Sequence, residues 1–366
     1  MANEAEKILS HFLNRLQRNE RIRKSLAIGI VALLLGSIIY FVYDIMPRRY
    51  ALSITGGNIL GNRHYLAKVL QDEGAKNGLS LKIVPGVGSQ EELEQVEQGK
   101  LDLAFIQGGL DNHYPHVVHV ATVASELLHV LVRSGVNDIS GLKGKLVNLS
   151  SRKSGTRIAA QKVLEFSGLT EGIDYTESNF SSEDLITMHP DKLPDAVMMI
   201  AFPPSEVVEF LVKERGYQVL EIPFPASLAL RWGWVADSKI LAYTYNVKPP
   251  VPATDIKTVG VNMHLVANQN VDPRAVFKVL ENLFNPAIEI RLRMKFDESQ
   301  LTAPSGFHLS EGTKMFLARK NPIFSAENFD KIKTIFGLVL SVFSTLLVIL
   351  KWFKGEPVEV GVEESN

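Results

Sequence analysis

Two long apolar stretches lie near the ends of the chain, and the sequence between them alternates short apolar runs with amphipathic ones. The stretches are Ser25 to Tyr43 and Thr334 to Trp352. At a rise of about 1.5 Å per residue, each is long enough as a helix to cross a hydrocarbon core about 30 Å thick. The pattern therefore predicts two transmembrane helices, with residues 44–333 on one side of a membrane.

The basic residues predict the orientation of these helices. Before the first stretch come Arg15, Arg18, Arg21, Arg23 and Lys24, whereas only Arg48 and Arg49 follow it. Lysine and arginine favour the cytoplasmic side. We expect a bacterial inner-membrane protein with both termini in the cytoplasm and the large middle part outside it. In the alternatives, the first stretch is a cleaved signal peptide and the second a buried core helix.

The middle of the chain predicts an α/β fold, because β-rich runs alternate with helical ones. In the first half we expect strands at 51–55, 79–84 and 101–105, with helices at 57–77 and 90–98. In the second half we expect strands at 129–133, 144–149, 195–200, 218–222 and 259–266, with helices at 156–167, 204–215 and 273–282. The helix 57–77 is expected to bury Tyr65, Leu66, Val69 and Leu70.

Two α/β halves joined by two chain crossings predict two lobes with a cleft between them. Turn residues at 134–141 and the Pro-rich run 247–258 mark the crossings. The predicted parts are a cytoplasmic amphipathic helix 1–24, transmembrane helix 25–46, lobe 1 at 47–134, lobe 2 at 135–255, the return part of lobe 1 at 256–330, transmembrane helix 331–353 and an acidic cytoplasmic tail 354–366.

Glycine and polar residues follow the predicted strands, where open α/β sheets bind their ligands. The candidates in lobe 1 are Thr55, Gly57, Asn58, Ser89 and Gln107. Asn58 and Ser89 are also plausible helix caps. Glu91 and Glu92 are interpreted as residues that suit the positive first turn of a helix. An ordinary strand–helix turn is the plain alternative at Gly57.

The turn before helix 156–167 supplies the candidates in lobe 2, which are Ser150, Ser154, Thr156 and Arg157. Hydroxyls, free amides at a helix N-terminus and a guanidinium together suit an anion. The alternative is a helix cap with basic residues in solvent. His113, His116 and His119 are better explained as residues of a cleft rim or of the surface than as zinc ligands. We therefore predict no metal and no cofactor.

In this order the motifs resemble the TAXI group of solute-binding proteins, which serve TRAP-type transporters. The resemblance rests on Thr55 to Asn58, Leu66 to Leu70, Gly88 to Gln107, Ser154 to Thr156, Asp195-Ala196 and His308. Ile59-Leu60 stand where that group has a tyrosine pair. The resemblance implies a type II periplasmic-binding-protein-like domain, here flanked by two transmembrane helices, and a carboxylate ligand such as an amino acid or dicarboxylic acid.

The predicted function is capture of a small anionic metabolite between the lobes for a TRAP-type transporter. The expected partners are that metabolite, the lipid bilayer and a multi-span permease or other membrane-complex subunit. A formal net charge of −1 does not suggest nucleic acid. Since no His-Glu-x-x-His, phosphate-binding loop or nucleophile elbow occurs, we predict no enzyme. The alternative function is a ligand sensor or an accessory subunit without transport.

Overall fold

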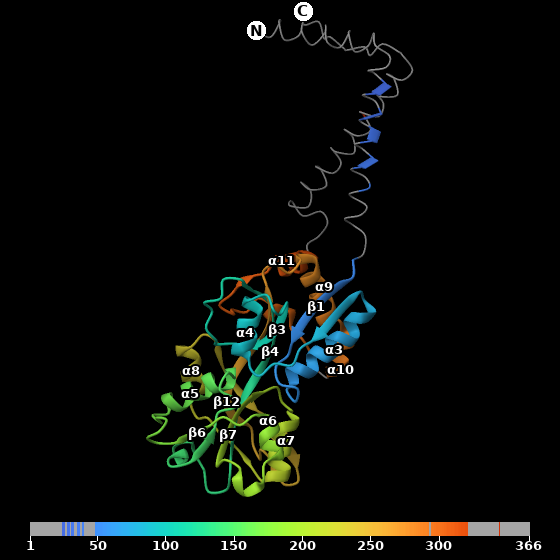
Figure 1. Cartoon of the computed structure of the whole chain (residues 1–366). Coiled ribbons are helices and arrows are strands. Elements are labelled where there is room, and N and C mark those ends of the chain that lie inside the picture. The colour runs from blue at the N-terminus through green and yellow to red at the C-terminus, as the bar shows by residue number, and fades with distance from the viewer. Residues whose placement is uncertain are drawn as a thin grey trace, which may run out of the picture. The chain divides into compact units, whose positions relative to one another are not determined.

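The computed structural model describes residues 48–292 and 294–320, together with positions 24, 25, 28, 29, 31, 32, 35, 36, 39 and 344. Residues 49–319 form a compact unit by themselves. Figure 1 shows this unit as a twisted sheet covered by helices. Apart from position 24, the predicted N-terminal helix 1–24 and the acidic tail 354–366 lie outside the described residues.

One mixed sheet runs through the whole unit, in the strand order β2-β1-β3-β12-β4-β7-β5-β6. At one end, β1 (Tyr50–Thr55) pairs in parallel with β2 (Leu79–Ile83) and β3 (Leu103–Gln107). At the other, β5 (Leu146–Asn148) pairs in parallel with its neighbours. The predicted α/β class is confirmed by this sheet.

Two long antiparallel strands, β4 (Val117–Val132) and β12 (Ile256–Asn268), connect the two ends of the sheet. The N-terminal part of β4 packs into one hydrophobic core and its C-terminal part into another, with the change between Val123 and Leu128. In β12 the change falls between Val261 and Met263. The two cores define two lobes, and the crossings are strands, whereas we expected turn-rich connections.

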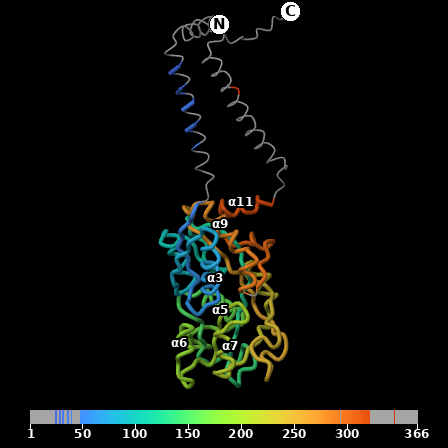
Figure 2. The backbone as a smooth tube through the Cα atoms, turned by 90° about the vertical axis from the view of Figure 1, so that its right-hand side faces the viewer, coloured from blue at the N-terminus to red at the C-terminus, as the bar shows by residue number. Residues whose placement is uncertain are grey.

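Lobe 1 combines the first part of the chain with its last described part, as the neighbouring blue and orange segments in Figure 2 show. Its helices and remaining strand are α3 (Asn62–Lys76), α4 (Ser89–Glu97), α9 (Pro273–Leu283), α10 (Pro286–Leu292), the short 3-10 helix Glu298–Gln300, β13 (His308–Leu309) and α11 (Glu311–Ala318).

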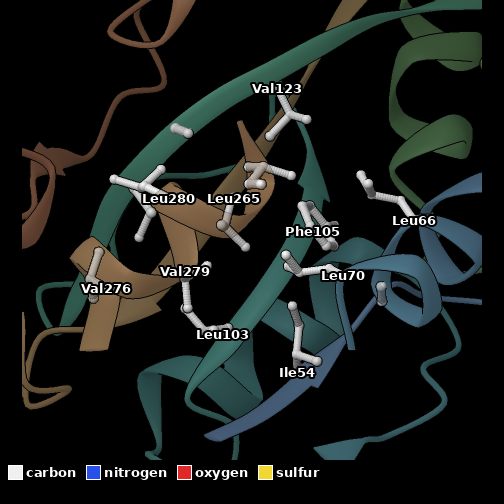
Figure 3. Packing of buried hydrophobic residues seen from close by; sticks show 14 of the residues in the cluster. Ile54, Leu66, Leu70, Leu103, Phe105, Val123, Leu265, Val276, Val279 and Leu280 are labelled. Atoms are coloured by element: carbon white, nitrogen blue, oxygen red, sulfur yellow. The ribbon is translucent and has the colours of Figure 1, made fainter. Parts of the chain in front are cut away.

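The core of lobe 1 lies between the sheet and helices α3 and α9 (Figure 3). From α3 it takes Leu66, Val69 and Leu70, which are at most 3% exposed and confirm that part of the predicted stripe. Tyr65 is 53% exposed, so its predicted burial is wrong. Helix α3 begins at Asn62, five residues later than expected, because residues 57–61 form the turn at the cleft.

Lobe 2 is built from the middle of the chain. Its elements are the 3-10 helix Ile139–Leu142, β5, α5 (Gly155–Phe166), β6 (Thr176–Ser178), α6 (Ser182–Thr187), the 3-10 helix Pro190–Lys192, β7 (Ala196–Ala201), α7 (Glu206–Arg215), β8 (Gln218–Leu220), α8 (Pro225–Arg231), β9 (Val235–Ile240), β10 (Asn246–Val247) and β11 (Pro250–Val251). The expected helices 156–167 and 204–215 correspond to α5 and α7.

Among the described residues, no helix has the length and apolar character that a membrane crossing requires. The longest, α3, has 15 residues, which reach only about 22 Å against a core of about 30 Å. This finding contradicts the predicted localisation in an inner membrane with two spans. Most of the two apolar stretches from which that prediction came lies outside the described residues.

Candidate functional site

A cavity of about 490 Å³ lies between the lobes and is lined by residues of both. Seven of the nine predicted site residues line it, namely Gly57, Asn58, Ser89, Gln107, Ser150, Ser154 and Thr156. Thr55 and Arg157 are not among its lining residues. Since the walls come from segments as far apart in sequence as Gly56 and Val207, only the folded arrangement of the lobes creates this space.

Hydrogen bonds join the two lobes around the cavity. The amide Nε2 of Gln107 donates to the carbonyl oxygen of Gly155 at 2.8 Å. Asn58 Nδ2 donates to Glu183 Oε2 at 2.7 Å, and Asn62 Nδ2 donates to the carbonyl oxygen of Phe202 at 2.6 Å. The lobes are therefore in direct contact, as in the closed state of a hinged two-lobe protein.

The backbones of the two lobes approach each other closely at Gly88. A Cβ added there would lie 2.5 Å from the carbonyl oxygen of Lys153. The next residues continue the contact, because the backbone N–H of Gln90 donates to the same oxygen at 3.3 Å. The absence of a side chain at Gly88 thus allows the two backbones to come this close. Its φ of 162° is ordinary extended backbone, which any residue adopts.

On the lobe 1 side, the turn after β1 brings the backbone to the cavity. Gly57 has a φ of 79°, which favours glycine, and its N–H donates to the Thr55 hydroxyl at 3.2 Å. The Thr55 hydroxyl thus stabilises the turn. The cap expected at Asn58 is wrong, because Gly61 is the N-cap of α3 and Asn58 Oδ1 accepts from the N–H of Leu60.

On the lobe 2 side, Ser154 is the N-cap of α5, and its hydroxyl accepts from the N–H of Thr156 at 3.1 Å. Thr156 is 6% exposed, and its hydroxyl accepts from the N–H of Ile200. Ser150 has a φ of 68°, a left-handed conformation uncommon outside glycine. Such strained residues concentrate at functional sites, which agrees with the position of Ser150 in the cavity wall.

Arg157, which was predicted to bind the anion, is paired with a carboxylate outside the cavity. Its Nε and Nη2 donate to the carboxylate of Glu177 at 2.5 and 3.1 Å. Glu177 is buried, with a side chain 4% exposed. The hydrogen bonds that Arg157 donates to Glu177 raise the pKa of Arg157. This ion pair stabilises the packing of α5 on β6, so the guanidinium is already engaged away from the cavity.

The cavity contains a different cation, Arg63, which the sequence analysis missed. Its Nε donates to both oxygens of Glu126 at 2.9 and 3.1 Å, and its Nη2 also donates to Glu126. Its Nη1 donates to the Ser89 hydroxyl at 2.8 Å, which in turn accepts from the N–H of Gln107. Burial lowers the pKa of Arg63, but Glu126 and Glu92 outweigh burial and raise it overall.

Arg63 retains binding capacity after these contacts. One further N–H on Nη1 and one on Nη2 have no partner in the part of the chain that the structure describes. The Arg63 side chain is 15% exposed and lines the cavity. A planar guanidinium presented in this way suits a carboxylate or another oxyanion.

Glu92 lies in the first turn of α4 as the sequence analysis expected, but its place in the cavity wall was missed. It lines the cavity and is only 1% exposed. Burial raises the pKa of Glu92 to about 7, although Arg63 opposes the change. Glu91, by contrast, lies outside the cavity wall and approaches Lys153 at 3.5 Å. The position of Glu92 beside Leu93 and Val96, which are both buried, was the available signal.

Within the described ranges, no group of three or more His, Asp and Glu residues is arranged to hold a metal ion. His113 contacts Asp111, and His116 contacts Glu97 at 2.6 Å. His119 is buried beside Thr122. The three histidines therefore have separate surroundings.

Comparison with known proteins gives one family and several solved structures. The model of the NMT1-like family matches residues 55–291. PhnD1 from Prochlorococcus marinus, solved with methylphosphonate, is 15% identical, with a TM-score of 0.47 over 74% of this chain and 97% of its own. The periplasmic aliphatic sulphonate binding protein SsuA from Escherichia coli is 14% identical, with a TM-score of 0.42 over 68% and 75%.

Proposed function

The chain belongs to the NMT1-like family, and from this premise we propose that it is a solute-binding protein that holds a small carboxylate-bearing molecule between its two lobes. The observation that supports this most directly is the cavity of about 490 Å³ whose wall is shared by both lobes. Cavities of this size accommodate small molecules. A solute that contacts both lobes stabilises their closed arrangement.

In this proposal Arg63 takes the role that the sequence analysis assigned to Arg157. Its remaining N–H groups would receive the carboxylate, together with the positive N-terminus of α5 at Ser154 and Thr156. Asn58, Ser89 and Gln107 would orient the solute. Gly57 and Ser150 would shape the wall, and Thr55 would hold the turn at Gly57 through its hydroxyl.

Binding is tested by thermal melting of the full chain with succinate, glutarate and L-glutamate. A solute at one hundred times its Kd should stabilise the fold by about 2.7 kcal/mol. The double variant Arg63→Gln/Glu126→Gln removes the cation without leaving a buried charge unpaired, and we expect it to weaken binding at least tenfold. Arg291→Gln is the matched control, since Arg291 pairs with Asp72 away from the cavity.

Arg157→Gln separates the two assignments of the cation. If it weakens binding while the double variant does not, the role of Arg63 is refuted and the original prediction stands. Absence of binding by all three acids would refute the proposed function.

Delivery to a TRAP-type transporter is the finer form of this proposal, and its support is the resemblance to the TAXI group. A tagged full chain should co-purify with a multi-span permease, and recovery of other partners alone would favour the sensor or accessory-subunit alternative. That the chain is no enzyme stays a prediction.

A further inference from the structure

A second cavity, of about 390 Å³, lies beside the solute cavity and shares part of its wall. The shared part consists of residues 59–63 and Glu126, so it includes the ion pair between Arg63 and Glu126. The remaining walls differ, since Tyr65 and Met294 line the second cavity but not the first. The second cavity is therefore a distinct space, which the proposed function does not use.

Both lobes contribute to the second cavity. Lobe 1 supplies residues of α3, Met263 of β12 and Leu292 at the end of α10. Lobe 2 supplies residues 202–204, which connect β7 to α7. Within this wall Asn62 Nδ2 donates to the carbonyl oxygen of Phe202 at 2.6 Å, which joins the lobes directly. A molecule that contacts both walls would stabilise this contact between the lobes.

The apolar side chains of the second cavity are accessible to a ligand. Ile59, Leu60 and Tyr65 line it and are 59%, 42% and 53% exposed. Phe202 and Met294, from opposite lobes, also line it and are half-buried. Single exposed apolar residues are ordinary, but several that gather in one concave space indicate a binding site. The walls can therefore remove apolar surface of a ligand from water.

The charges of the described lining residues cancel. Arg63 is paired with Glu126, while Lys68 from lobe 1 and Glu206 from lobe 2 contribute one charge of each sign. Burial, and to a smaller degree Lys68, lowers the pKa of His64, so its imidazole is uncharged at neutral pH. The wall thus offers no net attraction to an ion, which would also lose hydration against apolar side chains. This balance favours an uncharged ligand.

We propose that the second cavity binds an uncharged, largely apolar small molecule that contacts both lobes. Its volume lies within the range of about 300–1,000 Å³ that is usual for small-molecule sites. The solute of the proposed function stabilises the same closed arrangement, so the two ligands bind with positive cooperativity. This cooperativity rests on the proposed function, whereas the second site itself does not.

The probe is N-phenyl-1-naphthylamine, an uncharged compound whose fluorescence increases in apolar surroundings. Titrated into the full chain without any carboxylate, it should bind saturably at one site per chain. 1-Hexanol should displace it at least about fivefold more effectively than hexylammonium, which has the same chain length but a positive charge. Equal displacement by the two compounds would overturn the assignment of an uncharged ligand.

Two variants locate the probe, one in each lobe. Met294→Gln and Phe202→Gln place an amide in the second cavity without touching the wall of the solute cavity. Each should weaken binding of the probe at least about fivefold, because apolar contact area is lost. Met315→Gln is the matched control, since Met315 of α11 is 43% exposed and lines neither cavity. Unchanged binding in both cavity variants would overturn the site, and loss in only one would overturn its contact with both lobes.

Calorimetry with glutarate tests the cooperativity. With the probe at saturation, the Kd of glutarate should fall at least about threefold, and an unchanged Kd would overturn the cooperativity. If glutarate, succinate and L-glutamate all fail to bind while the probe binds as expected, the proposed function is refuted and the second site is retained. A chain that binds no probe but forms a dimer that both cavity variants dissociate would assign the cavity to a second copy and overturn the inference.

Discussion

Ionised Glu92 should destabilise the folded chain at neutral pH, and Glu92→Gln should remove that effect. The pKa of Glu92 is raised from its ordinary 4.5 to about 7 in the fold. Because the folded value is the higher one, the contribution of Glu92 to stability is greatest below pH 4.5 and is lost as the pH rises to 7. The full loss, about 3 kcal/mol, is present above pH 7.

The assay is urea denaturation followed by circular dichroism, at pH 5 and at pH 8, without solute. The amide that replaces the carboxyl group in Glu92→Gln brings its own cost of burial, but that cost is the same at both pH values. The difference in unfolding free energy between Glu92→Gln and the unmodified chain should therefore change by about 2–3 kcal/mol in favour of the variant at pH 8. Glu281→Gln, whose carboxylate pairs with Lys278 away from the cavity, should show no such change. A difference that is equal at pH 5 and pH 8 would refute the reasoning.

Three further predictions concern closure, the buried ion pair and acid stability. Gly88→Ala should weaken solute binding at least tenfold by calorimetry, because its Cβ would lie 2.5 Å from the carbonyl oxygen of Lys153; unchanged affinity would contradict this. Arg63→Ala should lower the unfolding free energy by about 3–5 kcal/mol in urea, because Glu126 stays buried without its cation, and adding Glu126→Gln should restore most of it. Burial lowers the pKa values of the imidazoles of His119, His129 and His264 to about 4, 4 and 3, respectively. Each should therefore reduce the unfolding free energy by about 1.4 kcal/mol per pH unit as the pH falls from 6.5 toward its folded pKa. An acid titration of stability checks the slope, which His129→Gln should reduce.

Much of the fold could be predicted because its local patterns are regular. Strands β1, β2 and β7 and helices α5, α7 and α9 lie within a few residues of the expected ranges. The first half of β4 was missed, because polar residues such as His119 and Thr122 interrupt its apolar run. Both are buried and contact each other inside the fold, which no local pattern reveals.

The crossings were misplaced for a related reason. A strand that serves two cores has no composition change at the point where it leaves one and enters the other. In β12 that point lies between Val261 and Met263, within an uninterrupted β-rich run. Turn residues mark the ends of strands and not their middles. The predicted end of the first part of lobe 1, at residue 134, is therefore too late, and the predicted start of its return part, at residue 256, is too early.

The candidate site likewise contains residues that could be predicted from the sequence and residues that could not. Residues in turns after strands could be predicted, since the topology alone brings strand ends to the cleft. Arg63 could not, because an arginine within an amphipathic helix is usually solvated, and its partner Glu126 is 63 residues away. Glu92 was assigned to the helix dipole, which explains its sequence position equally well. Glu92 differs from its neighbour Glu91 by being buried in the cavity wall, which the sequence does not reveal.

Proton exchange on binding reports on Glu92 independently of affinity. Arg63 is already paired with Glu126, so a bound carboxylate adds negative charge near Glu92 and should raise the pKa of Glu92 further. At pH 7, where Glu92 is about half ionised, the binding of glutarate should therefore take up protons. Calorimetry in two buffers of different ionisation enthalpy measures this exchange. Binding without proton uptake would mean that the carboxylate lies away from Glu92.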